Sequence, residues 1–219
     1  KNLVDILEGL NYPNLETIDL SHCGMVGNVP VFLFGGAHSE INLAHNRLEG
    51  GIPANRITGS LRSLDLSNNL LSGGLPTLLD LQFITSLNLA NNSLEGSDFV
   101  ISSAHLSDLD ISFNAFDFDI SELSKYPLST LNARYNQLTG TPSALSTIRS
   151  LKNADLSNNH LDQPIDNSKL HTMFTGSLQQ LYIHNNPLLP VVRSLDPMNG
   201  PWRTNQSQPS PSLPKIVEC

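Results

Sequence analysis

The sequence predicts an α/β repeat solenoid, in which each repeat adds one strand to a parallel β-sheet and returns through a mostly irregular or 3-10 segment. The first observation is a set of Asn residues spaced 22 or 23 apart, with a last step of 27. These are Asn46, Asn69, Asn92, Asn114, Asn136, Asn159 and Asn186. The second observation is a frame of apolar residues before each Asn, as in Leu61-x-x-Leu64-x-Leu66-x-x-Asn69. Repeats of this period stack to bury a continuous core that one repeat could not build alone.

Each repeat should supply one short strand. Within the Leu-x-Leu segment the period is two, so both apolar side chains point to one face of the strand. The central apolar residues are Ile18, Ile41, Leu64, Leu87, Leu109, Leu131, Ala154 and Leu181. They predict a solenoid of about eight repeats over residues 15–195. Residues 1–14 would form an N-terminal cap or partial repeat, and residues 196–219 a C-terminal cap with a Pro- and Ser-rich tail.

The recurring Asn has a structural explanation. The chain turns sharply after each strand, and an Asn side chain both donates and accepts, so it can pair with buried backbone groups there. We therefore expect a structural ladder of Asn side chains. Cys23 takes the ladder position of the first repeat. We interpret it as a small buried thiol, and the alternative is that it forms half of a disulfide.

Three returns carry Gly and Pro at a fixed spacing, in Gly27-x-x-Pro30, Gly50-Gly-Ile-Pro53 and Gly73-Gly-Leu-Pro76. Gly permits a positive φ and Pro stops a helix from propagating, so these returns should be extended or a single turn. With this element the sequence resembles the plant-type extracellular leucine-rich-repeat family. The resemblance implies a horseshoe with the parallel sheet on its concave face. Receptor-kinase ectodomains, receptor-like proteins and polygalacturonase inhibitors share this repeat, so it specifies the fold more than the function.

Composition narrows the classes of partner. The net charge is −8 and the Lys and Arg residues are scattered along the chain, which disfavours nucleic acid because phosphate binding needs a basic stripe. No apolar run is long enough to predict a membrane span. Asn91-Asn-Ser93 and Asn205-Gln-Ser207 are acceptor sequences for N-glycosylation, and charged residues make up only 15% of the chain. These features favour an extracellular or cell-surface location.

Two columns of residues should face outward from the strands. The first alternates Asp with Asn over seven repeats, in Asp19, Asn42, Asp65, Asn88, Asp110, Asn132 and Asp155, and ends at Tyr182. Stacked carboxylates would repel, and intervening amides separate the charges and supply donors. This column is interpreted as a self-satisfied polar ladder, or as an acidic strip for a basic peptide, a sugar or calcium. The second column is mostly small, in Ser21, Ala44, Ser67, Ala90, Ser112, Arg134, Ser157 and His184.

The residue before each ladder position supplies a third column, made of His22, His45, Asn68, Asn91, Phe113, Tyr135, Asn158 and Asn185. Phe113 and Tyr135 should be surface neighbours, with Arg134 beside Tyr135. Exposed aromatic residues with an Arg are typical of binding hot spots, and the alternative is an aromatic pair that stiffens the sheet. His22 and His45 should also stack, but no further ligand converges on them, so no metal and no cofactor are predicted.

The ends of the chain depart from the repeat. Residues 3–10 have apolar side chains at helical spacing and could cover the first repeat, and residues 168–174 could form one or two helical turns in an insertion of the last repeat. Trp202 would cover the other end. The segment 207–214 reads as an extended linker, as a site of O-glycosylation or as an arm that binds a neighbour. Cys219 could pair with a cysteine outside this chain.

Motifs for phosphate binding and for hydrolytic catalysis are missing, and acid and amide groups are spread along a ladder, so the chain is not expected to be an enzyme. The leading hypothesis is a secreted, non-catalytic module that binds a protein, peptide or glycan through its sheet face. The residues expected to contact the partner are Asp110, Phe113, Arg134, Tyr135, Asp155 and Tyr182. The alternatives are a structural subunit that assembles head-to-tail with copies of itself into filaments or a matrix, and an inhibitor of polygalacturonase-type glycosidases.

Overall fold

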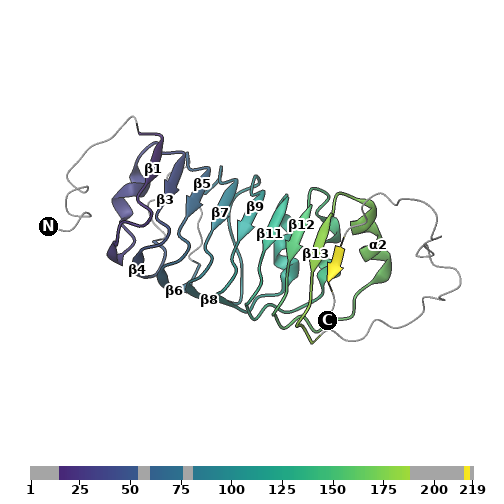
Figure 1. The fold of residues 1–219 in the computed structure, drawn as a ribbon. Helices are drawn as coiled ribbons and strands as arrows, with labels where there is room; N and C mark the ends of the chain where they lie inside the picture. Colours follow the sequence, from purple (N-terminus) through teal and green to yellow (C-terminus); the bar gives the residue numbers. More distant parts are fainter. Residues whose placement is uncertain (1–14, 54–59, 76–80, 188–214, 218–219) are drawn as a thin grey trace, which may run out of the picture.

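The computed structural model describes residues 15–53, 60–75, 81–187 and 215–217 of the 219-residue chain. They form an elongated solenoid in which successive repeats are stacked side by side from β1 to β13 (Figure 1). The described residues do not include the expected N-terminal helix, Trp202, Asn205, Cys219 or the Pro- and Ser-rich segment 207–214.

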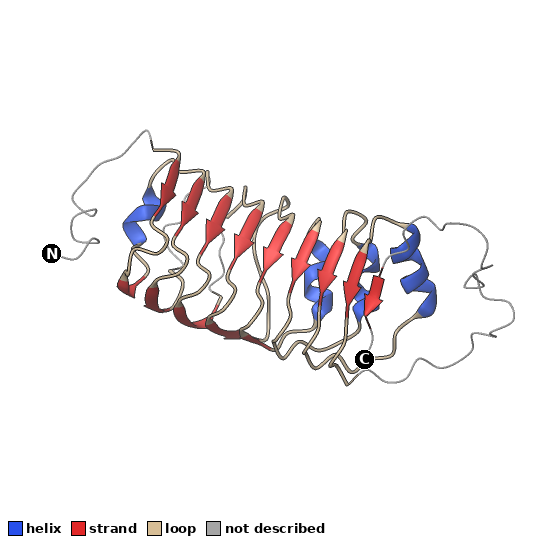
Figure 2. Cartoon of the chain, in the orientation of Figure 1, coloured by secondary structure: helices blue, strands red, loops and turns tan. Residues whose placement is uncertain are grey.

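A nine-stranded parallel sheet, the main sheet, lies along one side of the solenoid (Figure 2). Its strands, in spatial order, are β1 (Thr17–Asp19), β3 (Glu40–Asn42), β5 (Ser63–Asp65), β7 (Ser86–Asn88), β9 (Asp108–Asp110), β11 (Thr130–Asn132), β12 (Asn153–Asp155), β13 (Gln180–Tyr182) and β14 (Lys215–Val217). The central apolar residues pair in register from Ile18 to Leu181, as predicted. From Ile41 onward these residues are buried. The pairing of β14 with β13 was not predicted, since residues 215–217 were assigned to a tail.

A second parallel sheet runs through the returns of the first five repeats, where irregular or 3-10 segments were expected, with extended or single-turn returns in the first three; the pairing between returns was not predicted. Its strands are β2 (Val26–Asn28), β4 (Arg47–Gly50), β6 (Leu70–Gly74), β8 (Ser93–Gly96) and β10 (Ala115–Phe116). Returns of nearly equal length place equivalent backbone groups side by side, so the groups pair between repeats. Leu48, Leu71 and Leu94 point into the core from these strands, between exposed neighbours.

Helices occur in the return of the first repeat and in the returns from the fifth repeat onward, and bulky aromatic residues pack together in the fourth and fifth returns. The helices are η1 (Val31–Gly35) near the start, and η2 (Ile120–Lys125), η3 (Pro142–Thr147) and α2 (Asn167–Thr175) behind the later strands (Figure 2). The rings of Phe99, Phe118 and Tyr126 pack together, with centroids 5.4 and 5.7 Å from Phe99. The Tyr126 hydroxyl accepts from the Ile101 N–H at 2.8 Å and donates to the Phe99 carbonyl at 3.3 Å, so this core includes a satisfied polar group.

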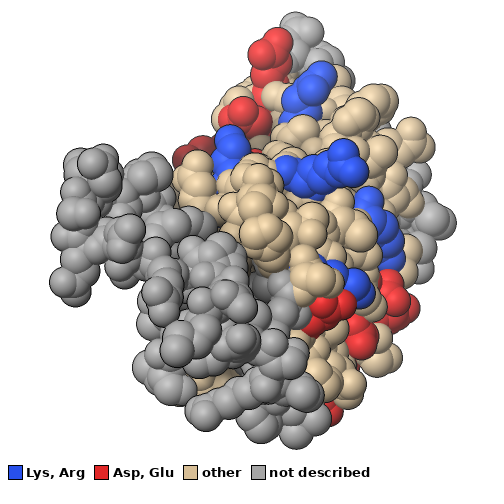
Figure 3. Space-filling view, turned by 90° about the vertical axis from the view of Figure 1, so that its right-hand side faces the viewer, with Lys and Arg blue, Asp and Glu red and all other residues tan. Residues whose placement is uncertain are grey.

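Basic residues are unevenly distributed along the solenoid, although a scattered distribution was expected. Among the described residues before 125, the Lys and Arg side chains are Arg47 and Arg62. The segment 125–187 carries Lys125, Arg134, Arg149, Lys152 and Lys169 against Asp155, Asp162 and Asp166. Figure 3 views this C-terminal end, and basic side chains lie across its exposed surface. The acidic character of the chain is therefore concentrated in the earlier repeats.

The helix predicted in the insertion is α2, and Asp166 caps its N-terminus. The Asp166 carboxylate accepts from the Ser168 N–H at 2.9 Å, the Ser168 hydroxyl at 2.6 Å and the Lys169 N–H at 3.3 Å. These bonds, with that of the Ser168 hydroxyl the largest influence, lower the pKa of Asp166 from its ordinary value of 3.8. Capping groups of this kind satisfy backbone donors that have no partner within the helix.

Acidification is expected to loosen α2. Because the folded-state pKa of Asp166 lies below the unfolded one, the cap stabilises the helix above about pH 4 and is lost as the pH falls through the folded pKa. Protection of α2 amides against hydrogen exchange should therefore drop between about pH 5 and pH 3. Asp166→Asn keeps an uncharged cap and should flatten this dependence. An equally steep drop in the Asn variant would assign the effect to another group.

Candidate functional site

The Asn ladder forms as predicted, and its bonds run back to the preceding repeat. The Asn136 amide donates to the carbonyls of Ile111, Ala133 and Arg134 at 2.9, 3.2 and 3.4 Å, and its Oδ1 accepts from the Phe116 N–H at 3.0 Å. The same pattern of one accepted and three donated bonds is made by Asn46, Asn69, Asn92, Asn114, Asn159 and Asn186. Each turn is therefore locked to the turn before it.

Cys23 departs from the prediction of a buried thiol, because its side chain is exposed and it forms no disulfide within the described residues. A ladder side chain bonds to the preceding turn, as Asn46 does to Met25 and Leu20. Cys23 lies in the first described repeat, so no described turn precedes it.

The alternating Asp and Asn residues form a self-satisfied ladder on the outer face of the main sheet. The amide of Asn88 donates to Asp65 Oδ2 at 2.9 Å, and the amide of Asn132 donates to Asp110 Oδ2 at 2.9 Å. The other oxygen of each carboxylate accepts from the backbone N–H two residues later, at 2.8 and 2.9 Å. Asp65 and Asp110 therefore each pair with the Asn of the next repeat, which gives this part of the face a period of two repeats.

We call the column before the ladder the turn column, because every one of its residues has a positive φ, between 54° and 57°. Asn and His are enriched in this left-handed region, which explains their frequency here. Side chains of this column also interact in pairs, each pair coming from two consecutive repeats. The rings of His22 and His45 stack with centroids 4.2 Å apart, and the Asn91 amide donates to Asn68 Oδ1 at 2.7 Å. The repeat pattern predicts this column but not its positive φ, although the recurrence of Asn and His in it is typical of that conformation.

Phe113 and Tyr135 are the aromatic pair of the turn column, and they stack as predicted. Their ring centroids lie 4.5 Å apart at an interplanar angle of 12°, and the residues are 40% and 48% exposed. A positive φ is a genuine outlier for side chains of this bulk. Strained, exposed aromatic residues persist only where the surrounding structure holds them, and such strain clusters at binding sites.

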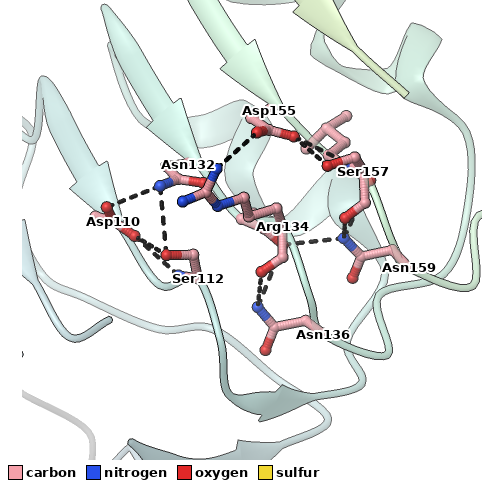
Figure 4. Close-up of polar contacts among 10 residues, drawn as sticks. Asp110, Ser112, Asn132, Arg134, Asn136, Asp155, Ser157 and Asn159 are labelled. Carbon is pink, nitrogen blue, oxygen red and sulfur yellow. Dashed lines mark hydrogen bonds and ion pairs between the residues drawn. The ribbon is translucent and has the colours of Figure 1, made fainter. Parts of the chain in front are cut away.

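Arg134 lies against this pair, with its guanidinium over the Phe113 ring. Its guanidinium is 5.1 Å from the Phe113 ring centroid, and its Nη1 is 3.8 Å from Asp155 Oδ2 (Figure 4). Arg134 stands where earlier repeats have a small residue. The Oδ1 of neighbouring Asn132 is buried without a hydrogen-bond partner, whereas the equivalent Asn88 accepts from the Ala90 N–H at 3.1 Å. The site thus interrupts the regular pattern at several adjacent positions.

The structure brings the predicted binding residues together on β9 to β13. Tyr182 is half-buried and pairs in register with Asp155, and Asp110 is bonded to Asn132 in the strand between Asp110 and Asp155. Asn91 is exposed, as its predicted role as a glycan acceptor requires. A cavity of about 460 Å³ between η3 and α2, lined by residues such as Leu145, Arg149 and Met173, includes none of these residues.

Two other expectations concern absences. In the described segments, no three His, Cys, Asp or Glu side chains are grouped closely enough to hold a metal ion. A search of those segments for a helix of sufficient length and hydropathy to cross a membrane also finds none.

Known proteins provide an independent comparison. The Leucine Rich Repeat family matches residues 14–35 and 60–81, and no curated protein sequence matches the chain. The plant peptide hormone receptor RGFR1 in complex with RGF2 is 28% identical, with a TM-score of 0.71, over 81% of this chain and 29% of the receptor chain. The ectodomain of the Arabidopsis receptor kinase HAESA, in complex with an extended IDA peptide hormone ligand, is 28% identical with a TM-score of 0.60.

That HAESA match covers 74% of this chain and 32% of the ectodomain, so the chain spans about a third of the length of these receptors. A plant ice-binding protein shares the fold, with 22% identity and a TM-score of 0.64 over 80% of this chain and 58% of that one. The repeat frame, the Asn ladder, the stacked parallel strands and these matches agree. The chain is a leucine-rich-repeat protein of the plant type.

Proposed function

We propose that this chain is a secreted, non-catalytic ligand-binding module whose partner docks on the outer face of the main sheet at β9 to β13. The observation that carries the proposal is the stacked pair of Phe113 and Tyr135, which is exposed and held at positive φ. The Asn side chains found at other turn-column positions tolerate this conformation at lower cost. A pair of bulky rings that is unfavourable for folding and open to solvent is best explained by a contact with a partner.

The composition of the site supports a protein or peptide as that partner. Tyr and Arg are enriched among the residues that dominate binding energy, and here Arg134 already lies over the Phe113 ring. The ring faces of Phe113 and Tyr135 are turned toward each other, which leaves less free ring face for stacking against a sugar. The matched receptors RGFR1 and HAESA, whose structures contain peptide hormones, make a peptide the preferred class.

The same face argues against catalysis. Asp110 and Asp155 each accept a hydrogen bond from a Ser hydroxyl at 2.6 Å. They lie on β9 and β12, and β11, which carries Asn132, runs between these strands. A general acid or base must converge with other groups on one reacting atom. The carboxylates here are spaced along a ladder and so present a surface to a partner.

An extracellular location is part of the proposal. The sequon at Asn91 lies on an exposed turn and the matched receptor structures include an ectodomain, which supports secretion. Asn91 precedes Phe113 in the turn column, so a glycan on Asn91 would border the proposed site. Mass spectrometry of the chain secreted from plant cells tests this, and an unmodified Asn91 in secreted protein would contradict its assignment as an acceptor.

The double substitution of Phe113→Ala and Tyr135→Ala should weaken ligand binding by about 2 kcal/mol or more, which is roughly 30-fold in Kd. Ligands would be selected from a displayed library of random peptides against the full chain, and Kd would be measured by calorimetry. Phe83→Ala is the matched control, because Phe83 is 46% exposed but lies outside the outward columns. Equal affinities of the double variant and the wild-type chain would refute this placement of the site.

A further inference from the structure

On the outer face of the main sheet, Asp side chains pair with Asn side chains of the next repeat, but the carboxylate of Asp155 lacks such a partner. Asp65 and Asp110 each receive an amide N–H on Oδ2 from the strand that follows them in the main sheet. Asp155 has Tyr182 at the equivalent position of the next strand, so no amide is available there. Its Oδ1 accepts from the Ser157 N–H at 3.0 Å and the Ser157 hydroxyl at 2.6 Å, as Asp110 Oδ1 does from Ser112. The difference is therefore confined to Asp155 Oδ2.

The neighbour of Asp155 Oδ2 on its other side is Arg134, and their contact is weak. The separation of 3.8 Å is an ion pair but too long for a hydrogen bond. The Arg134 side chain is 44% exposed and also lies over the Phe113 ring, so its charge is shared between two contacts and solvent. Exposed ion pairs contribute little to stability. A donor brought by a ligand could therefore bond to Asp155 Oδ2 without breaking a strong internal contact.

The charge of the surrounding face determines which donor is favoured. The outward residues at the start, the end and the turn of each main-sheet strand include the carboxylates of Asp19, Glu40, Asp65, Asp108, Asp110 and Asp155. Among these outward residues on β1 to β13, all of which the structure describes, Arg134 is the only Lys or Arg. Such a face attracts a cationic partner and repels an anionic one. Tyr182 lies beside Asp155 on the adjacent strand β13, and Tyr135, in the turn after β11, donates its N–H to the Ser157 carbonyl at 3.0 Å. Aromatic rings also favour a nearby cation.

We infer that the partner is a basic peptide segment, of which one Lys or Arg side chain binds Asp155 Oδ2 between Arg134 and Tyr182. This inference rests on the proposed function and adds the chemical class of the ligand to it. Asp155 fixes the position of the basic residue, while Phe113 and Tyr135 contact an apolar part of the same segment. Tyr182, by replacing the amide of earlier repeats, keeps Asp155 Oδ2 available.

The inference is tested on peptides selected from a random displayed library against the full chain. We expect a Lys or Arg at a fixed position in them, and exchange of that residue for norleucine should weaken binding at least 10-fold. Asp155→Asn should weaken binding of the parent peptide to a similar extent, and it should have little further effect on binding of the norleucine peptide. Tyr182→Asn, which restores the amide, should also weaken binding. Asp65→Asn is the matched control on the same column and should change Kd less than about twofold.

The possible outcomes separate the two proposals. Peptides that lose affinity with Phe113→Ala and Tyr135→Ala, but carry no fixed basic residue or ignore Asp155→Asn, would overturn the inference and leave the proposed site standing. Acidic peptides that depend on Arg134 would overturn it in the same way. Peptides insensitive to both sets of substitutions would overturn the inference together with the proposed site. The inference would be supported if a basic peptide residue contributed to affinity through Asp155, so that Asp155→Asn removed its contribution and Asp65→Asn did not.

Discussion

Replacing Asn136 with Ala should lower the free energy of unfolding by about 4 kcal/mol, because three or more buried backbone groups would lose their partner at about 1–3 kcal/mol each. The Asn136 side chain is 7% exposed and bonds to the Phe116 N–H and to carbonyls of Ile111 and Ala133. A methyl group cannot replace these bonds, and the close stacking of turns leaves little room for water. Urea denaturation followed by circular dichroism measures the loss.

The matched control is Asn158→Gly, in the turn column next to ladder residue Asn159. The Asn158 side chain accepts a bond at 2.9 Å from the Asn185 amide on the protein surface, and glycine adopts the φ of 56° without strain. The free energy of unfolding should therefore change by less than about 1 kcal/mol. Similar losses in the two variants would show that the ladder bonds are not what holds successive turns together.

The main sheet could be predicted from the sequence because the apolar pattern that forms each strand is local and recurs in every repeat. The register of β1 to β13 follows from one alignment of apolar residues, and the pairing from Ile18 to Leu181 agrees with it. The helix in the insertion could also be predicted, since Asp166 and Ser168 supply its cap. The second sheet could not, because its pairing depends on how adjacent returns lie beside each other and not on an apolar alternation visible within one return.

The direction of the ladder bonds was also hidden in the sequence. An Asn at a turn could bond to its own turn, to the next or to the previous one, and the structure shows bonds to its own and to the previous turn. For Cys23, at the first ladder position, the preceding turn would fall among residues that the structure does not describe. The prediction of a buried thiol assumed that all positions of the column share one environment.

The candidate site was predictable in part. The adjacency of Phe113 and Tyr135 follows from the repeat length alone. The position of Arg134 does not, because a long side chain can extend toward either neighbouring repeat, and here it lies over Phe113 and near Asp155. The missing amide partner of Asp155 appears only after the bonds of Asp65 and Asp110 are known.

The double substitution of Phe113→Asn and Tyr135→Asn should raise the free energy of unfolding while abolishing ligand binding. Each aromatic residue at positive φ costs about 1–3 kcal/mol, and Asn tolerates that conformation. Stacking of the two rings stabilises the wild-type chain by about 0.5–1.5 kcal/mol, and the contact with Arg134 by about 0.5–1 kcal/mol. Because the strain is larger than these contributions, the Asn variant should be more stable by about 1 kcal/mol or more. The two amides would also pair as Asn68 and Asn91 do, at 2.7 Å.

The converse pair of variants, Asn68→Phe with Asn91→Tyr, grafts the rings onto repeats three and four and gives the control. Urea denaturation should show a loss of stability of about 1 kcal/mol or more, because the graft introduces the same strain. The graft should not increase affinity for the selected peptides, because neither Arg134 nor Asp155 lies beside it. If the Asn variant were less stable than the wild-type chain, the rings would act as a structural clamp. If it were more stable and no longer bound ligand, the chain would carry Phe113 and Tyr135 at the expense of stability, for the partner alone.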